Sequence, residues 1–114
     1  MKKLMFSLLF LVFLGGFLSA QQLPKITIVN NTGYTVYYVY ASPSDDDDWG
    51  EDLLGDKILR NGQSTEITLK LPLNAKSVYD ILLEDEDEDT YSKFNVRITN
   101  NMRVEFTFDD FDEF

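Results

Sequence analysis

Apolar and polar residues alternate along several short segments of the chain, and a period of two predicts β-strands. Segments 25–29, 65–71 and 102–108 show this alternation most clearly, and aromatic and β-branched residues fill segment 34–40. Asparagine and glycine residues lie between these segments, as expected of tight turns. Further strands are expected at 57–59, 78–83 and 90–98, and no helix longer than one turn is expected.

The pattern as a whole predicts an all-β fold, namely an antiparallel β-sandwich of about seven short strands, with a small β-barrel as the alternative. If each strand runs antiparallel to the next, the turns at 30–33 and 84–89 and the tail from Asp109 lie at one end. The connections 45–56 and 71–76 then lie at the other end. Alternation predicts three groups of core side chains: Ile67, Leu69 and Leu71; Tyr79, Ile81 and Leu83; and Phe94, Val96 and Ile98.

Four tyrosines lie in segment 34–40, which is expected to be a central strand because both of its faces could be covered. Strict alternation would place Tyr34, Tyr38 and Tyr40 on the same face as Val36. A row of rings of this kind could form a platform for stacking sugars, but core and cross-strand packing is the more common role. The rings are therefore predicted to pack inside the sandwich.

The longest connection contains the only tryptophan of the chain, Trp49. Asp48 or Ser44 could cap a single helical turn that ends at Gly55. The apolar side chains of the connection would then plug one end of the sandwich: Trp49, Leu53 and Leu54.

The first twenty residues have the pattern of a secretory signal peptide. The start is basic at Lys2 and Lys3, and residues 4–13 are apolar apart from Ser7. A retained membrane anchor is the alternative, but this apolar run is shorter than the roughly 20 residues that a membrane span needs. We therefore expect a cleaved signal peptide at 1–20, one mature domain at 21–114 with no stable membrane insertion, and a periplasmic or secreted protein.

Charge and composition narrow the classes of partner. The formal net charge is −10, and removal of Lys2 and Lys3 with the signal peptide would take it to −12. Such a charge disfavours nucleic acid and anionic membrane surfaces, and it favours cationic partners or metal ions. The chain has no cysteine and no histidine, which excludes thiol and Ser–His chemistry and the common zinc sites.

Six consecutive carboxylates, Glu84–Asp89, join two of the expected strands and predict an acidic hairpin tip. Calcium prefers six to eight oxygen ligands from carboxylates and carbonyls. Asp85, Asp87 and Asp89 alternate along the tip, and Asp109 or Asp110 of the tail could reach the same end. The alternative is a solvated charged tip that prevents edge-to-edge aggregation.

The stretch 48–55, Asp-Trp-Gly-Glu-Asp-Leu-Leu-Gly, is the most specific part of a wider pattern. The pattern reads Ser-Pro…Asp-Trp-Gly-x-Asp-x-Leu-Gly…Leu-x-x-Gly-x-Ser, and it resembles a family of small exported bacterial proteins with no established activity. The resemblance implies export and a β fold, but no reaction. Members of the family often have glycine at the position of Glu88, and its absence here weakens the case for a tight metal-binding turn. The resemblance marks six residues as a structural signature or binding site: Asp48, Trp49, Gly50, Asp52, Leu54 and Gly55.

These observations favour a non-enzymatic exported binding or structural domain. One alternative is a calcium-binding sandwich that uses the acidic tip, and another is an acidic inhibitor or docking module for a cationic protein of the cell envelope. Glycoside hydrolysis by paired carboxylates is disfavoured, because these carboxylates lie in solvated runs and a domain of this size offers little cleft. No cofactor is expected apart from calcium.

Overall fold

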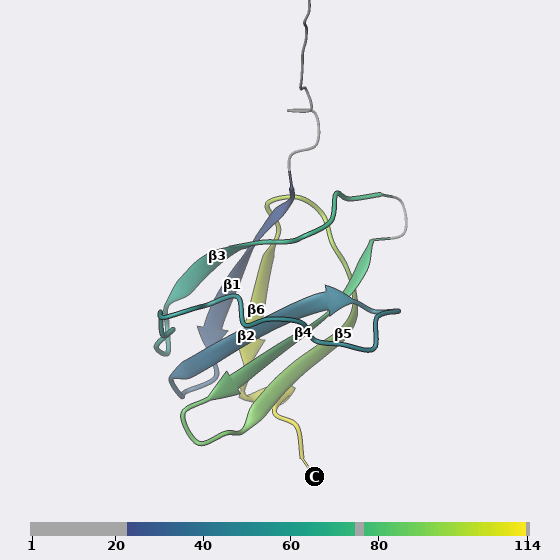
Figure 1. Cartoon of the computed structure of the whole chain (residues 1–114). Coiled ribbons are helices and arrows are strands. Elements are labelled where there is room, and N and C mark those ends of the chain that lie inside the picture. The colour runs from purple at the N-terminus through teal and green to yellow at the C-terminus, as the bar shows by residue number, and fades with distance from the viewer. Residues whose placement is uncertain (1–22, 75–76, 114) are drawn as a thin grey trace, which may run out of the picture.

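The computed structural model describes residues 23–74 and 77–113, which fold into a β-sandwich of two three-stranded sheets (Figure 1). Because these strands form two separate sheets, the predicted sandwich is confirmed over the closed barrel. The elements are β1 (Lys25–Asn31), β2 (Val36–Pro43), β3 (Ser64–Thr68), β4 (Val78–Asp85), β5 (Thr90–Arg97), β6 (Arg103–Thr107) and a short 3₁₀ turn, η3 (Phe108–Asp110).

The strand orders are β3-β1-β6 in one sheet and β2-β4-β5 in the other. All strand pairs are antiparallel except β1 and β6, which lie side by side and parallel, with Thr27 opposite Arg103. The β4–β5 turn, the turn after β1 and the C-terminal tail lie at one end of the sandwich, as predicted (Figure 1). Backbone hydrogen bonds from Glu86 to Thr35 and from Asp112 to Thr90, both 2.9 Å, hold these segments together.

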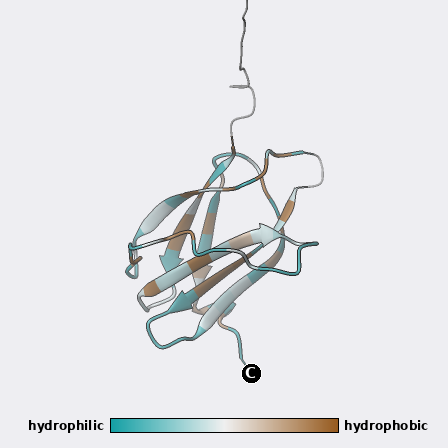
Figure 2. Ribbon diagram, in the orientation of Figure 1, coloured by the Kyte–Doolittle hydropathy of each residue, from teal (hydrophilic) through white to brown (hydrophobic). Residues whose placement is uncertain are grey.

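The core lies between the two sheets and is built from the inward positions of every strand. Figure 2 shows hydrophobic residues on the facing strands and hydrophilic residues on the β4–β5 turn. Burial of this apolar surface is the main favourable contribution to folding in a chain without disulfides. Its largest fully buried apolar side chains are Tyr91, Phe106, Ile26, Ile28, Leu69, Ile81, Leu83, Val36 and Val39.

The prediction for the tyrosine-rich segment is wrong in two respects. Strand β2 is an edge strand of its sheet, and β4 is the central strand. A bulge between Val36 and Tyr38 adds one residue to β2, so that Val36 and Val39 both point into the core. Tyr37 and Tyr38 are consequently exposed, at 42% and 41%, because an inserted residue reverses the faces of the positions beyond it.

A second bulge moves Phe94 out of the predicted core. Val96 lies opposite Tyr79, but Lys93 lies opposite Ile81, so β5 has two residues where β4 has one. The extra residue exchanges the faces of β5, so Tyr91 is buried and Phe94 is 60% exposed. Strict alternation counted back from Ile98 could not detect the insertion.

Two further expectations fail at the ends of strands. The expected strand 57–59 is reduced to an isolated bridge between Leu59 and Val36. Leu71 is 53% exposed instead of buried, because β3 ends at Thr68 and the chain leaves the sheet before Pro72.

The predicted signal peptide at 1–20 lies outside the described residues. Within 23–74 and 77–113, no helix is long and apolar enough to cross a membrane.

Candidate functional site

The acidic tip brings together three of the five predicted metal ligands. Carboxylate oxygens of Asp85, Asp87 and Asp89 lie within 4.8 Å of one another. Asp87 and Asp89 are exposed, whereas Asp85 is 2% exposed at the end of β4. The three residues therefore differ in environment, although they are equivalent in sequence.

Hydrogen bonds explain the burial of Asp85. Its Oδ1 accepts the backbone N–H groups of Asp87 at 2.9 Å and Asp89 at 3.0 Å, and its Oδ2 accepts the hydroxyl of Tyr91 at 2.9 Å. Burial, followed by the hydrogen bond to Asp85, raises the pKa of Tyr91 above its usual 10.0. Three donors thus satisfy a buried carboxylate, and Asp85 shapes the turn from within.

Glu88 has a left-handed backbone, with φ 66°. Glycine adopts this conformation without strain, whereas residues with a Cβ adopt it at a cost. The turn therefore keeps the geometry that a glycine would favour, while Glu88 adds another exposed carboxylate.

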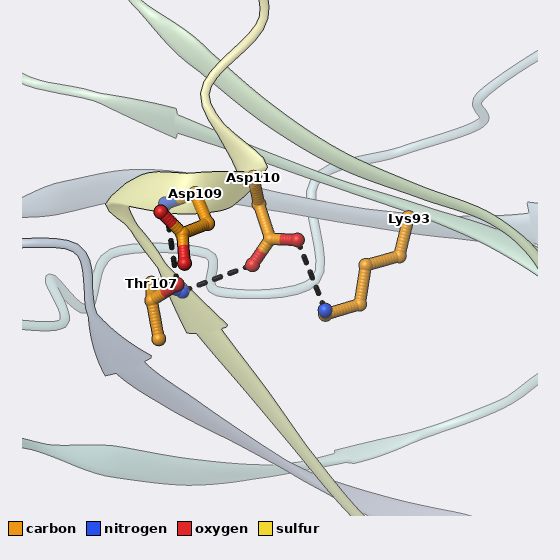
Figure 3. Close-up of polar contacts among 4 residues, drawn as sticks. All are labelled: Lys93, Thr107, Asp109 and Asp110. Carbon is orange, nitrogen blue, oxygen red and sulfur yellow. Dashed lines mark hydrogen bonds and ion pairs between the residues drawn. The ribbon is translucent and has the colours of Figure 1, made fainter.

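The two tail aspartates do not join the acidic group at the tip. They have structural roles of their own beside Thr107 and Lys93 (Figure 3). Asp110 accepts the backbone N–H of Thr107 at 2.9 Å and forms an ion pair with Lys93 at 3.0 Å. The backbone N–H of Asp109 donates to the hydroxyl of Thr107 at 3.2 Å. These contacts form a capping box that starts η3 and attaches the tail to β5.

The connection 44–56 contains turns and bends and no helical turn, so that prediction is wrong. Asp52 fastens it to the outer edge of β2. The Asp52 carboxylate accepts the backbone N–H groups of Val39, Leu54 and Gly55 at 3.0, 3.0 and 3.1 Å. Leu54 is buried in the core, and Gly55 has φ 64°. The spacing Asp-x-Leu-Gly at 52–55 therefore has a structural explanation.

Trp49 does not plug the end of the sandwich. It is half-buried, and its ring lies 6.4 Å from the ring of Phe94, centroid to centroid, at an interplanar angle of 47°. Asp48 and Gly50 beside it are exposed, and Gly50 has φ 81°. Trp49 is therefore placed against an exposed side chain of β5 and not in the main core.

A shallow groove of about 450 Å³ lies on the outer face of the β2–β4–β5 sheet, the face turned away from the other sheet. Asp112 of the tail closes one side of it, where Oδ2 accepts the hydroxyls of Thr90 at 2.8 Å and Ser92 at 2.5 Å. We call it the Trp49 groove. It is lined by Trp49, Leu82, Thr90, Ser92, Phe94 and Asp112.

Sequence reasoning missed most of this groove, because its residues come from four segments that only the fold brings together: the connection 44–56, β4, β5 and the C-terminal tail. Of its residues, only Trp49 is among the predicted site residues, and Phe94 is predicted to lie in the core. The one sequence hint of the bulge that exposes Phe94 is Asn95, because asparagine tolerates a left-handed backbone better than most residues. Asn95 has φ 59°, and Asp80 accepts its backbone N–H at 2.9 Å, which stabilises the bulge.

Two tyrosines of β2, Tyr38 and Tyr40, lie on the same outer face. The rings of Tyr38 and Tyr40 stack at 6.3 Å, centroid to centroid. Tyr38 lies opposite Glu84, and Tyr40 lies opposite Leu82. Burial, followed by the charges of Glu84 and Asp52, raises the pKa of Tyr40. Aromatic rings and carboxylates are thus interleaved across the sheet.

No family model, curated protein or solved structure matches the chain. The functional argument therefore rests on the geometry of the acidic tip and of the outer sheet face.

Proposed function

We propose that this protein is an exported, non-enzymatic binding domain that docks a basic protein surface. The observation that carries the proposal is the set of aromatic side chains left exposed beside carboxylates on the outer face of the β2–β4–β5 sheet. Exposed rings next to charged groups are typical of interface anchors, because tyrosine and tryptophan dominate the binding energy of many interfaces.

The outer face supports the proposal through its chemistry. Tyr38 and Phe94 are exposed, whereas other aromatic rings of the same fold are buried at inward positions. The two bulges that expose them change the register of β2 and β5. Glu84 and Asp112 lie among the rings, so a partner of complementary positive charge fits this face.

The overall charge supports the same class of partner. The acidic tip at 84–89 and the run Asp45–Asp48 carry carboxylates at opposite ends of the sandwich. A net charge of −10 attracts basic surfaces over several ångströms and speeds their association. The same charge repels nucleic acid and anionic membranes.

The roles of the less exposed carboxylates favour binding over catalysis. Asp52, Asp80, Asp85, Asp110 and Asp112 each accept hydrogen bonds from donors of the protein itself. A catalytic acid or base needs to reach a substrate proton, whereas these groups hold turns, a bulge and the tail in place.

The test is binding of the purified protein to labelled peptides of equal length, rich in arginine and lysine or in glutamate and aspartate, measured by fluorescence anisotropy. We expect the basic peptides to bind and their affinity to fall steeply as salt is raised, because exposed charges are screened. Equal binding of acidic peptides, or binding of basic peptides that is insensitive to salt, would contradict the proposal.

Calcium binding at the acidic tip is a second candidate, and the closeness of the Asp85, Asp87 and Asp89 carboxylates favours it. Asp85 already accepts three hydrogen bonds, so Asp87 and Asp89 would supply most of the charge. We expect calorimetric heat and a thermal shift with calcium that the double variant Asp87→Asn, Asp89→Asn loses. Absence of heat and of a thermal shift at millimolar calcium would exclude this candidate.

A further inference from the structure

We infer that the Trp49 groove is the docking point for an arginine side chain of the basic partner. This inference rests on the proposed function and makes it specific, because it names the position on the outer face and the chemical group that binds there. Its basis is the combination of two aromatic rings, one carboxylate and two hydroxyl groups in one groove.

The two rings form an open wall that suits a planar cation. Trp49 comes from the connection after β2, and Phe94 comes from the bulge of β5; their centroids are 6.4 Å apart and their planes are tilted by 47°. Cations bind over the faces of tryptophan and phenylalanine rings, and guanidinium groups also stack on them. The wall is 60% exposed at Phe94, so a partner side chain can reach it.

The bulge fixes this wall in position. Asp80 Oδ1 accepts the backbone N–H of Asn95 at 2.9 Å and the hydroxyl of Ser44 at 2.6 Å. One carboxylate thus connects the bulge that presents Phe94 to the start of the connection that carries Trp49. A preformed wall lowers the conformational entropy lost on binding.

The polar side of the groove offers acceptors. The hydroxyls of Thr90 and Ser92 both direct their hydrogens to Asp112 Oδ2, which leaves their lone pairs available. No described residue donates to Asp112 Oδ1. A guanidinium has five N–H donors and no acceptor, so it matches these three side chains.

A neutral saccharide matches the same side chains less well. A sugar hydroxyl both donates and accepts, but Thr90, Ser92 and Asp112 have their hydrogens committed or have none. The carboxylate also has no charge to pair with in a neutral sugar, whereas a cation gains a charge-assisted hydrogen bond. The groove chemistry therefore favours the basic side chain.

Because Trp49 is the only tryptophan in the sequence, its fluorescence reports directly on the groove. The experiment titrates the purified protein with three ligands. The first is a short peptide whose only charged side chain is one arginine, the second is the same peptide with citrulline in place of arginine, and the third is a neutral oligosaccharide. We expect a saturable fluorescence change with arginine only, because citrulline has the same shape without the charge.

Substitutions in the groove then test whether the arginine peptide binds there. Phe94→Leu keeps apolar bulk but removes the ring face, and Asp112→Asn keeps an acceptor for Thr90 and Ser92 but removes the charge. We expect each substitution to lower the affinity for the arginine peptide about tenfold. The matched controls are Tyr37→Ala, an exposed aromatic of β2 outside the groove, and Glu66→Gln, an exposed carboxylate of the other sheet, and both should bind normally.

The outcomes separate this inference from the proposed function. If basic peptides bind but Phe94→Leu and Asp112→Asn bind them as tightly as the original protein, the groove assignment is wrong and the docking function stands. If no basic peptide binds, both fail. A response to the citrulline peptide equal to that of arginine, or a response to the oligosaccharide alone, would also overturn the assignment. Unchanged circular dichroism and melting temperature of the variants confirm that each is folded.

Discussion

At the scale of single residues, burial separates carboxylates that look alike in the sequence. Asp85 and Asp87 are two positions apart in one acidic run, yet Asp85 is 2% exposed and Asp87 is exposed. Only Asp85 accepts the hydroxyl of buried Tyr91. The run therefore contains one structural carboxylate, and its remaining charges are available to solvent or to a partner.

This difference predicts opposite outcomes for two matched substitutions. Asp85→Ala should lower the free energy of unfolding by about 3 kcal/mol, because it leaves three hydrogen-bond donors at the turn without their acceptor. Asp87→Ala should change it by less than about 0.5 kcal/mol, as is usual for an exposed side chain. Chemical denaturation of both variants measures this, and equal effects would contradict the role assigned to Asp85.

The burial of Tyr91, followed by its hydrogen bond to Asp85, predicts a pH dependence of stability. The pKa of Tyr91 is raised in the folded state above its usual 10.0, so the folded protein keeps a proton that the unfolded chain releases. Stability from this group is complete below about pH 10 and falls as the pH rises beyond it. Tyr91→Phe should be less stable at neutral pH and lose less stability above pH 10. Thermal melts across this range test it, and an unchanged alkaline slope in the variant would refute it.

At the scale of elements, alternation predicted the strands well and the insertions not at all. The pattern of Tyr79, Ile81 and Leu83 correctly identified the inward face of β4, because that strand has no extra residue. In β2 and β5 one added residue exchanged the faces, and a bulge depends on contacts such as the one between Asp80 and Asn95. Those contacts come from other parts of the fold, so local periodicity could not show them.

The Trp49 groove could not be predicted for the same reason. Trp49 was noticed because it is unique, but its position depends on how the connection 44–56 is attached. Asp52 bonds that connection to the edge of β2. The sequence predicts a helical turn capped by Asp48 or Ser44, whereas in the structure the Asp52 carboxylate accepts three backbone N–H groups.

The attachment by Asp52 predicts a local effect on dynamics. Asp52→Ala should cost about 2 kcal/mol, because the N–H groups of Val39, Leu54 and Gly55 lose their common acceptor. Hydrogen exchange should accelerate at these amides more than in β4. Asp48→Ala is the matched control in the same connection and should leave exchange unchanged; uniform acceleration across the domain would indicate global destabilisation instead.

At the scale of the whole molecule, charge affects folding and docking in opposite ways. Twenty acidic residues face ten basic ones, and the described structure has three ion pairs, two of them well exposed. The excess carboxylates repel each other most strongly in the compact state. Exposed ion pairs contribute little stability, so screening of the repulsion should dominate the response to salt.

We therefore expect the melting temperature to rise when sodium chloride is added, while affinity for basic peptides falls over the same concentrations. One salt series measured by thermal melting and by anisotropy checks both. The opposite signs are informative, because a loss of peptide binding caused by unfolding would be accompanied by a lower melting temperature. A melting temperature that falls with salt would show that attractive ion pairs, and not carboxylate repulsion, control the stability of this sandwich.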